Sequence, residues 1–170
     1  IGDIPYSNPT VALGWQHCLT LPREVRVNEH GTLSQLPCTE INSLREDEII
    51  IADGSCKKFK LPFDLTAEVS GKYEIIIDKD IVLHYENGLF ELKFLGMVGF
   101  GRDIRYAEMD NCHDIRIIAD TSSLEIYLDK GRKVLSTRFY PDSKEVSVLV
   151  RGLSAQIYPM RAMNITLRDE

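Results

Sequence analysis

The chain has 170 residues, of which 44% are hydrophobic and 27% are charged, an ordinary composition for a globular protein. A chain of this length can bury enough apolar surface to fold without a metal ion or disulfide bonds. Its formal net charge is −6, with 20 basic and 26 acidic residues spread along the sequence. The sequence has no basic patch, so we do not expect it to bind nucleic acid. Its apolar runs are too short for a membrane-spanning helix.

The first 46 residues differ in composition and in expected elements from the rest of the chain. The sequence begins with Ile1 rather than Met, and no signal peptide follows, so we expect this chain to have been cut from a longer one. Residues 1–14 are rich in Pro, Ser, Asn and Gly, which predicts a loop. The next expected elements are three short strands and one helical turn, at residues 15–22, 23–28, 32–36 and 39–46.

From residue 47 onward the sequence predicts closely spaced strands, and Asn87-Gly88 is its strongest short hairpin signal. With these two residues as the loop, Tyr85 faces Phe90 and Leu83 faces Leu92. Turn chemistry and hydrophobic register therefore agree. A second hairpin turn is expected at residues 53–54, joining strands at 48–52 and 57–61.

Residues 120–141 predict a further complete hairpin. Leu124, Ile126 and Leu128 alternate with Glu125, Tyr127 and Asp129, the pattern of a strand with one buried face. A two-residue loop at residues 130–131 would pair Ile126 with Leu135, and a three-residue loop with a glycine bulge is the alternative.

The whole pattern predicts an all-β fold. Further strands are expected at residues 72–78, 102–107, 114–120, 145–150, 153–158 and 162–167. About ten short strands without a long amphipathic helix indicate an antiparallel β-sandwich. A closed barrel is the main alternative.

The predicted strand face with Glu125, Tyr127 and Asp129 is the candidate for chemistry. The two carboxylates are four residues apart, about 13 Å along a strand. That distance is too long for the paired carboxylates of a glycosidase. Tyr127, flanked by these polar neighbours, is the best candidate for a sugar-stacking ring, and the alternative is that another sheet or a partner domain covers it.

Other reactive residue types form no recognisable site in the sequence. The four histidines lack metal-ligand spacing, and the glycines at 96, 99 and 101 do not precede a helix. The four cysteines are widely spaced without a C-x-x-C pair, which indicates scattered reduced thiols. We therefore predict no metal and no cofactor.

Two separated segments resemble motifs of glycoside hydrolase family 32, which contains invertases, sucrose-6-phosphate hydrolases, levanases and inulinases. Residues 14–24, GWQHCLTLPRE, are similar to the W-x-x-x-[ML]-[TS]-L-P-R-E segment at the end of the family's five-bladed β-propeller. Residues 33–37, LSQLP, resemble the family's approach to the interdomain linker. Residues 120–141 are similar to the D-x-S-x-[LIV]-E-[IV]-[FY] … R-x-[FY]-P signature of its C-terminal sandwich.

The resemblance implies three parts of the chain. Residues 1–36 correspond to the C-terminal remnant of the propeller, residues 37–46 to a linker, and residues 47–170 to a sandwich of the lectin-like jelly-roll type. The family's nucleophile, R-D-P and E-C motifs belong to the propeller and do not occur here, so no residue is assigned a catalytic role. We expect residues 1–36 to pack against the sandwich or to exchange with a neighbouring chain.

By this resemblance, the parent protein is a cytoplasmic β-fructofuranosidase that hydrolyses sucrose or sucrose-6-phosphate without a cofactor. The chain itself is expected to be a non-catalytic module that stabilises the propeller and could supply a homodimer surface. The alternative is a lectin-like module that binds fructans or sucrose through Tyr127, Glu125 and Asp129. A third hypothesis is an enzyme with a site that these motifs do not reveal.

Overall fold

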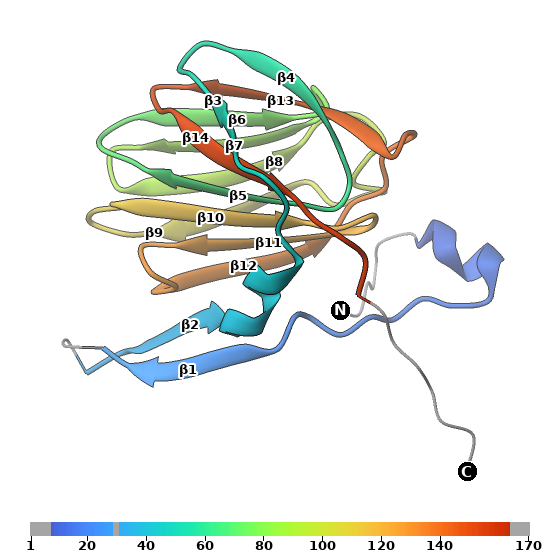
Figure 1. Ribbon diagram of the computed structural model, residues 1–170, viewed down its shortest axis with the longest axis horizontal. Helices are drawn as coiled ribbons and strands as arrows, with labels where there is room; N and C mark the ends of the chain where they lie inside the picture. Colours follow the sequence, from blue (N-terminus) through green and yellow to red (C-terminus); the bar gives the residue numbers. More distant parts are fainter. Residues whose placement is uncertain (1–7, 29–30, 164–170) are drawn as a thin grey trace.

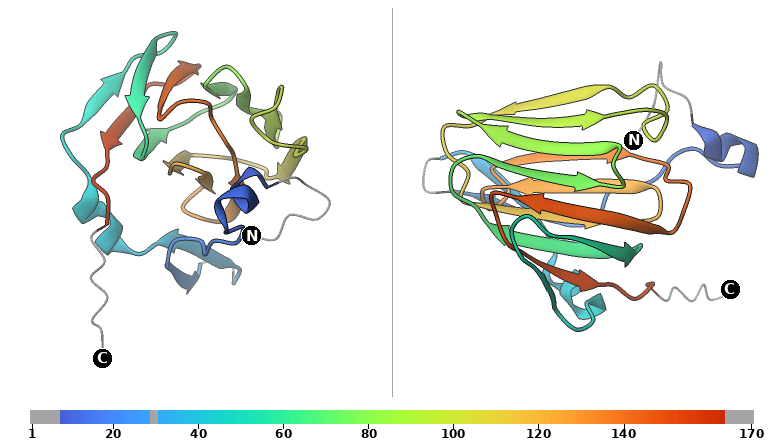
Figure 2. Two further views of the ribbon diagram at one scale, coloured as in Figure 1. Left: turned by 90° about the vertical axis from the view of Figure 1, so that its right-hand side faces the viewer. Right: turned by 90° about the horizontal axis from the view of Figure 1, so that it is seen from above.

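The computed structural model describes residues 8–28 and 31–163 and confirms the antiparallel β-sandwich. Two six-stranded sheets face each other (Figures 1 and 2). Sheet I has the order β12 (Lys133–Arg138), β11 (Ser123–Leu128), β10 (Asp114–Ala119), β5 (Phe63–Glu68), β14 (Ala155–Pro159) and β3 (Ile49–Ile51). Sheet II has the order β4 (Cys56–Lys60), β13 (Glu145–Arg151), β6 (Tyr73–Ile77), β7 (Ile81–Glu86), β8 (Leu89–Phe94) and β9 (Ile104–Glu108).

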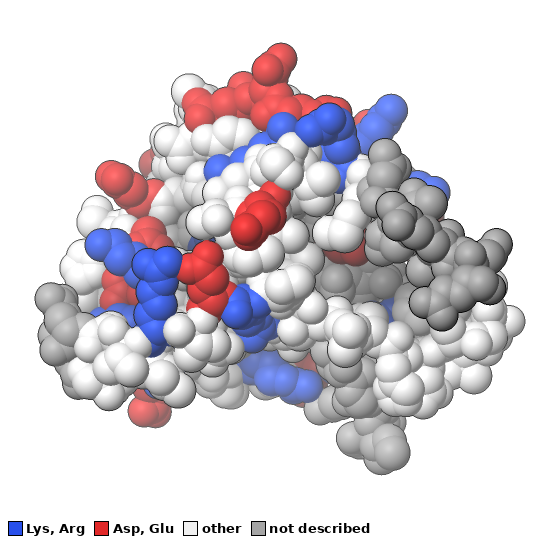
Figure 3. All heavy atoms as spheres, turned by 60° about the horizontal axis from the view of Figure 1, so that its bottom comes forward, with Lys and Arg blue, Asp and Glu red and all other residues white. Residues whose placement is uncertain are grey.

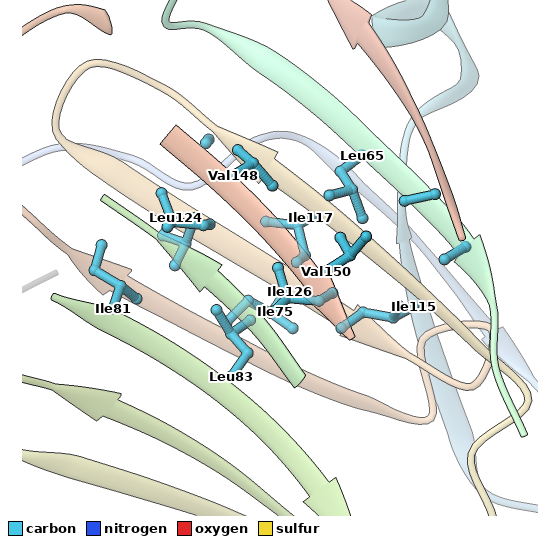
Figure 4. Close-up of a cluster of buried hydrophobic side chains, with 14 of the residues drawn as sticks. Leu65, Ile75, Ile81, Leu83, Ile115, Ile117, Leu124, Ile126, Val148 and Val150 are labelled. Carbon is cyan, nitrogen blue, oxygen red and sulfur yellow. The ribbon is translucent and has the colours of Figure 1, made fainter. Parts of the chain in front are cut away.

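The core lies between the sheets and is built by alternating aliphatic residues. Ile126 from sheet I and Ile75, Leu83 and Val150 from sheet II are fully buried and meet in the interior (Figure 4). Burying each such side chain contributes roughly 1.5–3 kcal/mol. Successive strand residues point to opposite faces, so the same alternation places Glu125 and Tyr127 on the outer face of sheet I.

Both strong hairpin predictions are confirmed. Strands β7 and β8 pair with Tyr85 opposite Phe90 and Leu83 opposite Leu92. Strands β11 and β12 pair with Ile126 opposite Leu135. The Arg132 N–H donates to the Asp129 carbonyl at 3.1 Å, closing the two-residue loop at residues 130–131.

Three details of the strand prediction are wrong. Residues 15–22 form no strand. The turn at residues 53–54 exists, with the Ser55 N–H 3.0 Å from the Ala52 carbonyl, but it joins no hairpin. It carries the chain from sheet I to sheet II, because β3 pairs with β14 and β4 pairs with β13.

The sequence prediction also missed β5, a central strand of sheet I that contains the buried Asp64. The strand expected at 162–167 lies almost wholly outside the described residues.

The N-terminal segment begins beyond one end of the sandwich and then runs along the outer face of sheet I (Figures 1 and 2). It comprises a 3-10 helix η1 (Pro9–Leu13), a two-stranded hairpin of β1 (Arg23–Val27) and β2 (Leu33–Pro37), and a second 3-10 helix η2 (Thr39–Leu44). The Gln35 N–H donates to the Gly131 carbonyl at 2.9 Å, which joins the hairpin to the β11–β12 turn. In its described part, the segment therefore packs against the sandwich of the same chain. The described residues contain no helix long and apolar enough to cross a membrane.

Candidate functional site

The two motif-bearing segments of the sequence meet at Glu125. One Glu125 carboxylate oxygen accepts hydrogen bonds from the Arg23 guanidinium at 2.8 Å and from the Tyr127 hydroxyl at 2.5 Å. The other oxygen accepts the Leu21 backbone N–H at 2.7 Å. The Arg23 guanidinium also donates to the Ser136 hydroxyl on β12 at 2.5 Å. We call these five residues the Glu125 clasp.

The Glu125 clasp is shielded from water. Glu125 is 4% exposed and Tyr127 is 1% exposed. Burial raises the pKa of Tyr127, and the hydrogen bond to Glu125 raises it further, so the hydroxyl remains a donor. The Arg23 guanidinium also lies 5.5 Å from the centre of the Tyr127 ring, at cation–π distance. Charge, hydrogen bonding and ring contact all hold β1 on β11.

Of the two interpretations of Tyr127, the structure supports the one in which the ring is covered, because Tyr127 is 1% exposed. The Tyr127 ring belongs to a small second core with Ile41, Ile118 and neighbouring apolar residues of the N-terminal segment. A sugar would need an open ring face, and the chain's own residues cover this one. Alternation along a strand shows which face a side chain takes, but it does not show what covers that face. Sugar binding at Tyr127 and Glu125 stays a prediction that requires the N-terminal segment to move.

Asp129 belongs to a separate cluster at the adjacent turn. Its carboxylate lies 3.0 Å from the His113 ring nitrogen and 2.6 Å from the Arg132 guanidinium. Burial raises the pKa of Asp129, but these two hydrogen bonds outweigh it and lower the pKa below the usual value. Asp129 is 7% exposed and therefore offers no open carboxylate to a ligand. The three predicted site residues thus form two buried clusters instead of one exposed surface.

A second ionic cluster was missed from the sequence. Asp64 on β5 is fully buried, and its carboxylate accepts hydrogen bonds from the guanidinium groups of Arg45 at 2.8 Å and Arg116 at 2.6 Å. The Arg116 guanidinium also donates to the Asn42 side chain of η2 at 2.7 Å. This cluster fixes η2 and the following residues on sheet I. The sequence signal for the strand is the apolar–polar alternation of residues 63–68, FDLTAE, which the prediction overlooked.

Arg138 provides a third connection between the motif segments. This arginine at the end of β12 is fully buried and donates to the Ser122 carbonyl at 2.8 Å and the Gln16 carbonyl at 3.2 Å. Its guanidinium lies 5.0 Å from the centre of the Trp15 ring and 5.1 Å from that of Tyr140. Trp15 and Arg23 of the first motif are therefore both held by residues of the second.

The N-terminal segment presents apolar side chains to the outside. Eight of the 13 exposed large hydrophobic residues in the described chain belong to it: Val11, Leu13, Trp15, Leu19, Val25, Val27, Leu33 and Leu36. Leu19 is 96% exposed and borders a cavity of about 400 Å³ that Ile41 and Met160 also line. Figure 3 turns this side of the molecule forward and shows wide uncharged areas between the charged groups. So many large apolar side chains exposed on one segment favour an interaction site there.

The described residues contain no group of three or more His, Cys, Asp and Glu side chains that could hold a metal ion. None of the four cysteines forms a disulfide bond within the described part of the chain, and Cys112 is the buried one. The arrangement can hold two parts of a chain together, and it presents no exposed pair of catalytic carboxylates at Glu125 and Asp129.

Residues 93–165 match the family model described as "Glycosyl hydrolases family 32 C terminal". These residues, in the C-terminal part of the chain, are therefore similar to the C-terminal domain of glycosyl hydrolase family 32. The resemblance drawn from the two motifs is thereby confirmed.

Several curated proteins are similar to most of the chain. A sucrose-6-phosphate hydrolase of Bacillus subtilis is 26% identical over 162 residues, which cover 87% of this chain and 34% of that protein. A sucrose-6-phosphate hydrolase of Klebsiella pneumoniae is 29% identical over 151 residues, which cover 78% of this chain and 28% of that protein. The chain therefore spans about a third of the length of the curated relatives it matches.

Solved structures share the fold of this chain. A sucrose-6-phosphate hydrolase from Lactobacillus gasseri matches with a TM-score of 0.81 at 18% identity, over 94% of this chain and 37% of that chain. A GH32 beta-fructofuranosidase from Bombyx mori matches with a TM-score of 0.77 at 21% identity, over 91% of this chain and 35% of that chain. In both cases the similarity extends over more than nine tenths of this chain.

Proposed function

We propose that this chain is the non-catalytic C-terminal module of a β-fructofuranosidase of the sucrose-6-phosphate hydrolase kind. In this proposal, residues 1–36 complete the end of a catalytic propeller, residues 37–46 link it to the sandwich, and residues 47–170 form the sandwich. The names of the relatives support the substrate class, and the length of those relatives supports a larger parent protein.

The exposed apolar side of the N-terminal segment is the observation that carries the proposal. The sandwich buries its own apolar residues in one continuous core, whereas residues 11–36 expose eight large ones. An isolated globular domain rarely keeps such a surface open to water. A propeller that packs on this side would bury it.

The ionic clusters explain how the segment is kept in place for such a partner. A buried carboxylate without a partner is strongly destabilising, so Glu125 and Asp64 favour the docked position of Arg23 and Arg45. The outer side of the segment is then held in a fixed orientation by the sandwich. The module acts as a preformed platform for the propeller and takes no part in bond cleavage.

The test combines this chain with the upstream part of its parent, produced separately and ending before Ile1. We expect the two to co-purify, and we expect bound propeller to unfold at a higher temperature and to hydrolyse sucrose-6-phosphate. Leu19→Asp should weaken the association, whereas Leu95→Asp, which changes a 48% exposed leucine outside the N-terminal segment, should not. Hydrolysis by this chain alone, or equal loss in both variants, would contradict the proposal.

A further inference from the structure

The two outer faces of the sandwich are covered differently. The N-terminal segment runs along sheet I, whereas no described helix or strand lies over the outer face of sheet II (Figure 2). Side chains on this outer face alternate with the buried residues of β6, β7, β8 and β13. An antiparallel sheet face that meets only water is usually polar, so apolar residues on it require a reason.

An apolar row crosses the outer face of sheet II, perpendicular to the strands. Leu149 on β13 is paired with Ile76 on β6, and Ile76 is paired with Val82 on β7. The row continues through Lys93 on β8 to Ile104 on β9. All five side chains are only partly buried within this chain. Because neighbouring strands lie about 4.8 Å apart, the row is about 19 Å long.

A charged row lies beside the apolar row. Arg151, Glu74, His84 and Glu91 are cross-strand neighbours on β13, β6, β7 and β8. The Arg151 guanidinium lies 2.7 Å from the Glu74 carboxylate. The Lys93 ammonium donates to the Glu91 carboxylate at 2.8 Å, which draws the charge toward the charged row and leaves the aliphatic part of Lys93 in the apolar one. The charged row therefore has a cation at its β13 end and a carboxylate at its β8 end.

We propose that the outer face of sheet II binds a second copy of this chain about a two-fold axis. The axis runs parallel to the strands and passes between β6 and β7, so the two sheets pack face to face with aligned strands, a common arrangement of packed sheets. This rotation reverses the strand order of the second copy. Ile76 then faces Val82 of the second copy, and Leu149 faces the aliphatic part of its Lys93. The apolar row is thereby covered along its length.

Charge complementarity selects a second copy as the occupant. A two-fold interface has to be complementary to itself, and a row of like charges would repel its own copy. The same rotation places Arg151 opposite Glu91 of the second copy, and Glu74 opposite its His84. Symmetry repeats each of these pairs once, so the two charged rows attract each other.

The size of the face predicts a weak and reversible dimer. Six strands span about 24 Å, and a strand of five residues spans about 17 Å. The resulting area of about 400 Å² is smaller than the roughly 800 Å² that each partner buries in a standard stable interface. The inference is independent of the proposed packing on a propeller, because that packing uses the N-terminal segment on the opposite side of the sandwich.

The first test is analytical ultracentrifugation of the 170-residue chain over a range of concentrations. We expect a monomer–dimer equilibrium with a micromolar Kd, and we expect Leu19→Asp in the N-terminal segment to leave it unchanged. Ile76→Asp should weaken dimerisation at least about tenfold, because it places a carboxylate in the apolar row. Ile50→Asp is the matched control and should dimerise like the unsubstituted chain, since Ile50 is 60% exposed and lies on β3 of sheet I.

A mixing experiment tests the two-fold register. Arg151→Glu places two carboxylates opposite each other at both symmetric positions, and Glu91→Arg places two guanidinium groups there. Each variant alone should dimerise at least about tenfold more weakly than the unsubstituted chain. A 1:1 mixture should dimerise again, because every Arg151 and Glu91 position then faces an opposite charge. Recovery in the mixture also shows that both variants are folded.

Three results would overturn this assignment. A chain that stays monomeric up to millimolar concentration would show that the face does not bind a second copy. Loss of the dimer in Leu19→Asp, or equal weakening by Ile76→Asp and Ile50→Asp, would place the contact elsewhere on the chain. A mixture of the two charge variants that dimerises no better than either one alone would contradict the register.

Discussion

Removing the carboxylate of Glu125 should release the N-terminal segment from the sandwich. In a Glu125→Ala variant, the Arg23 guanidinium, the Leu21 N–H and the Tyr127 hydroxyl all lose their acceptor. Loss of one partner from a buried ion pair typically costs roughly 3–5 kcal/mol. The Arg23 side chain keeps 17% exposure, so water can partly replace the lost carboxylate. We therefore expect a loss near the lower limit, about 3 kcal/mol.

The loss can be located as well as measured. Chemical denaturation gives the global change, and a loss of about 3 kcal/mol corresponds to a fall in Tm of roughly 6–12 °C for a chain of this size. Amide hydrogen exchange should accelerate at Leu21 and Gln35, which lie in the segment, while the exchange at Ile75 in the sandwich core should change little. This difference is expected because the core contacts of Ile75 do not involve the segment.

A double-mutant cycle with Arg23→Met and Glu125→Gln isolates the interaction between the two side chains. We expect a coupling energy of about 1–3 kcal/mol. A coupling near zero, or unchanged exchange at the Leu21 amide in Glu125→Ala, would refute the conclusion that this pair holds the segment in place. Val25→Ala, a change at an exposed residue of the same hairpin, serves as the control.

Three further predictions test the turn, the titrating groups and the thiols. Gly131 has a φ of +77°, and a Cβ there would lie 2.0 Å from the Gln35 carbonyl oxygen. Gly131→Ala should therefore lower the free energy of unfolding by about 1–3 kcal/mol in denaturation experiments. An unchanged denaturation midpoint would contradict the close approach of the two turns. Because the pKa of Asp129 is lower in the folded chain, the ionised carboxylate stabilises the fold at every pH above its unfolded pKa of about 4, and this stabilisation is lost as the pH falls through the folded pKa. The difference in unfolding free energy between the unsubstituted chain and Asp129→Asn should therefore be largest at neutral pH and vanish in acid. A difference that does not depend on pH would argue against this linkage. Burial raises the pKa of the Cys112 thiol, so iodoacetamide should modify the exposed Cys56 first in the folded chain, and equal rates by peptide mass spectrometry would show that Cys112 is accessible.

The sequence determined those parts of the fold in which local and non-local signals agree. The Asn87-Gly88 turn requires a backbone that most residues avoid, and the apolar residues on either side agree with one register only. Leu124, Ile126 and Leu128 likewise had to face the core, because a shift of one residue would bury Glu125, Tyr127 and Asp129 there instead. The residue types and order of the two motifs were also sufficient to indicate the family.

The tertiary structure alone decided the partners of the outer face of sheet I. Strand β5 has the apolar–polar alternation of a strand, FDLTAE, which the prediction overlooked. That pattern assigns Asp64 to the outer face without showing that it is buried, and only Arg45 and Arg116, distant in sequence, make the buried charge stable. Period-two alternation placed Tyr127 outside the main core, and the same pattern describes an exposed ring and a covered one equally well. Covering depends on a segment about 100 residues earlier in the chain, which carries Arg23 to Glu125 and closes the site that the strand pattern had left open.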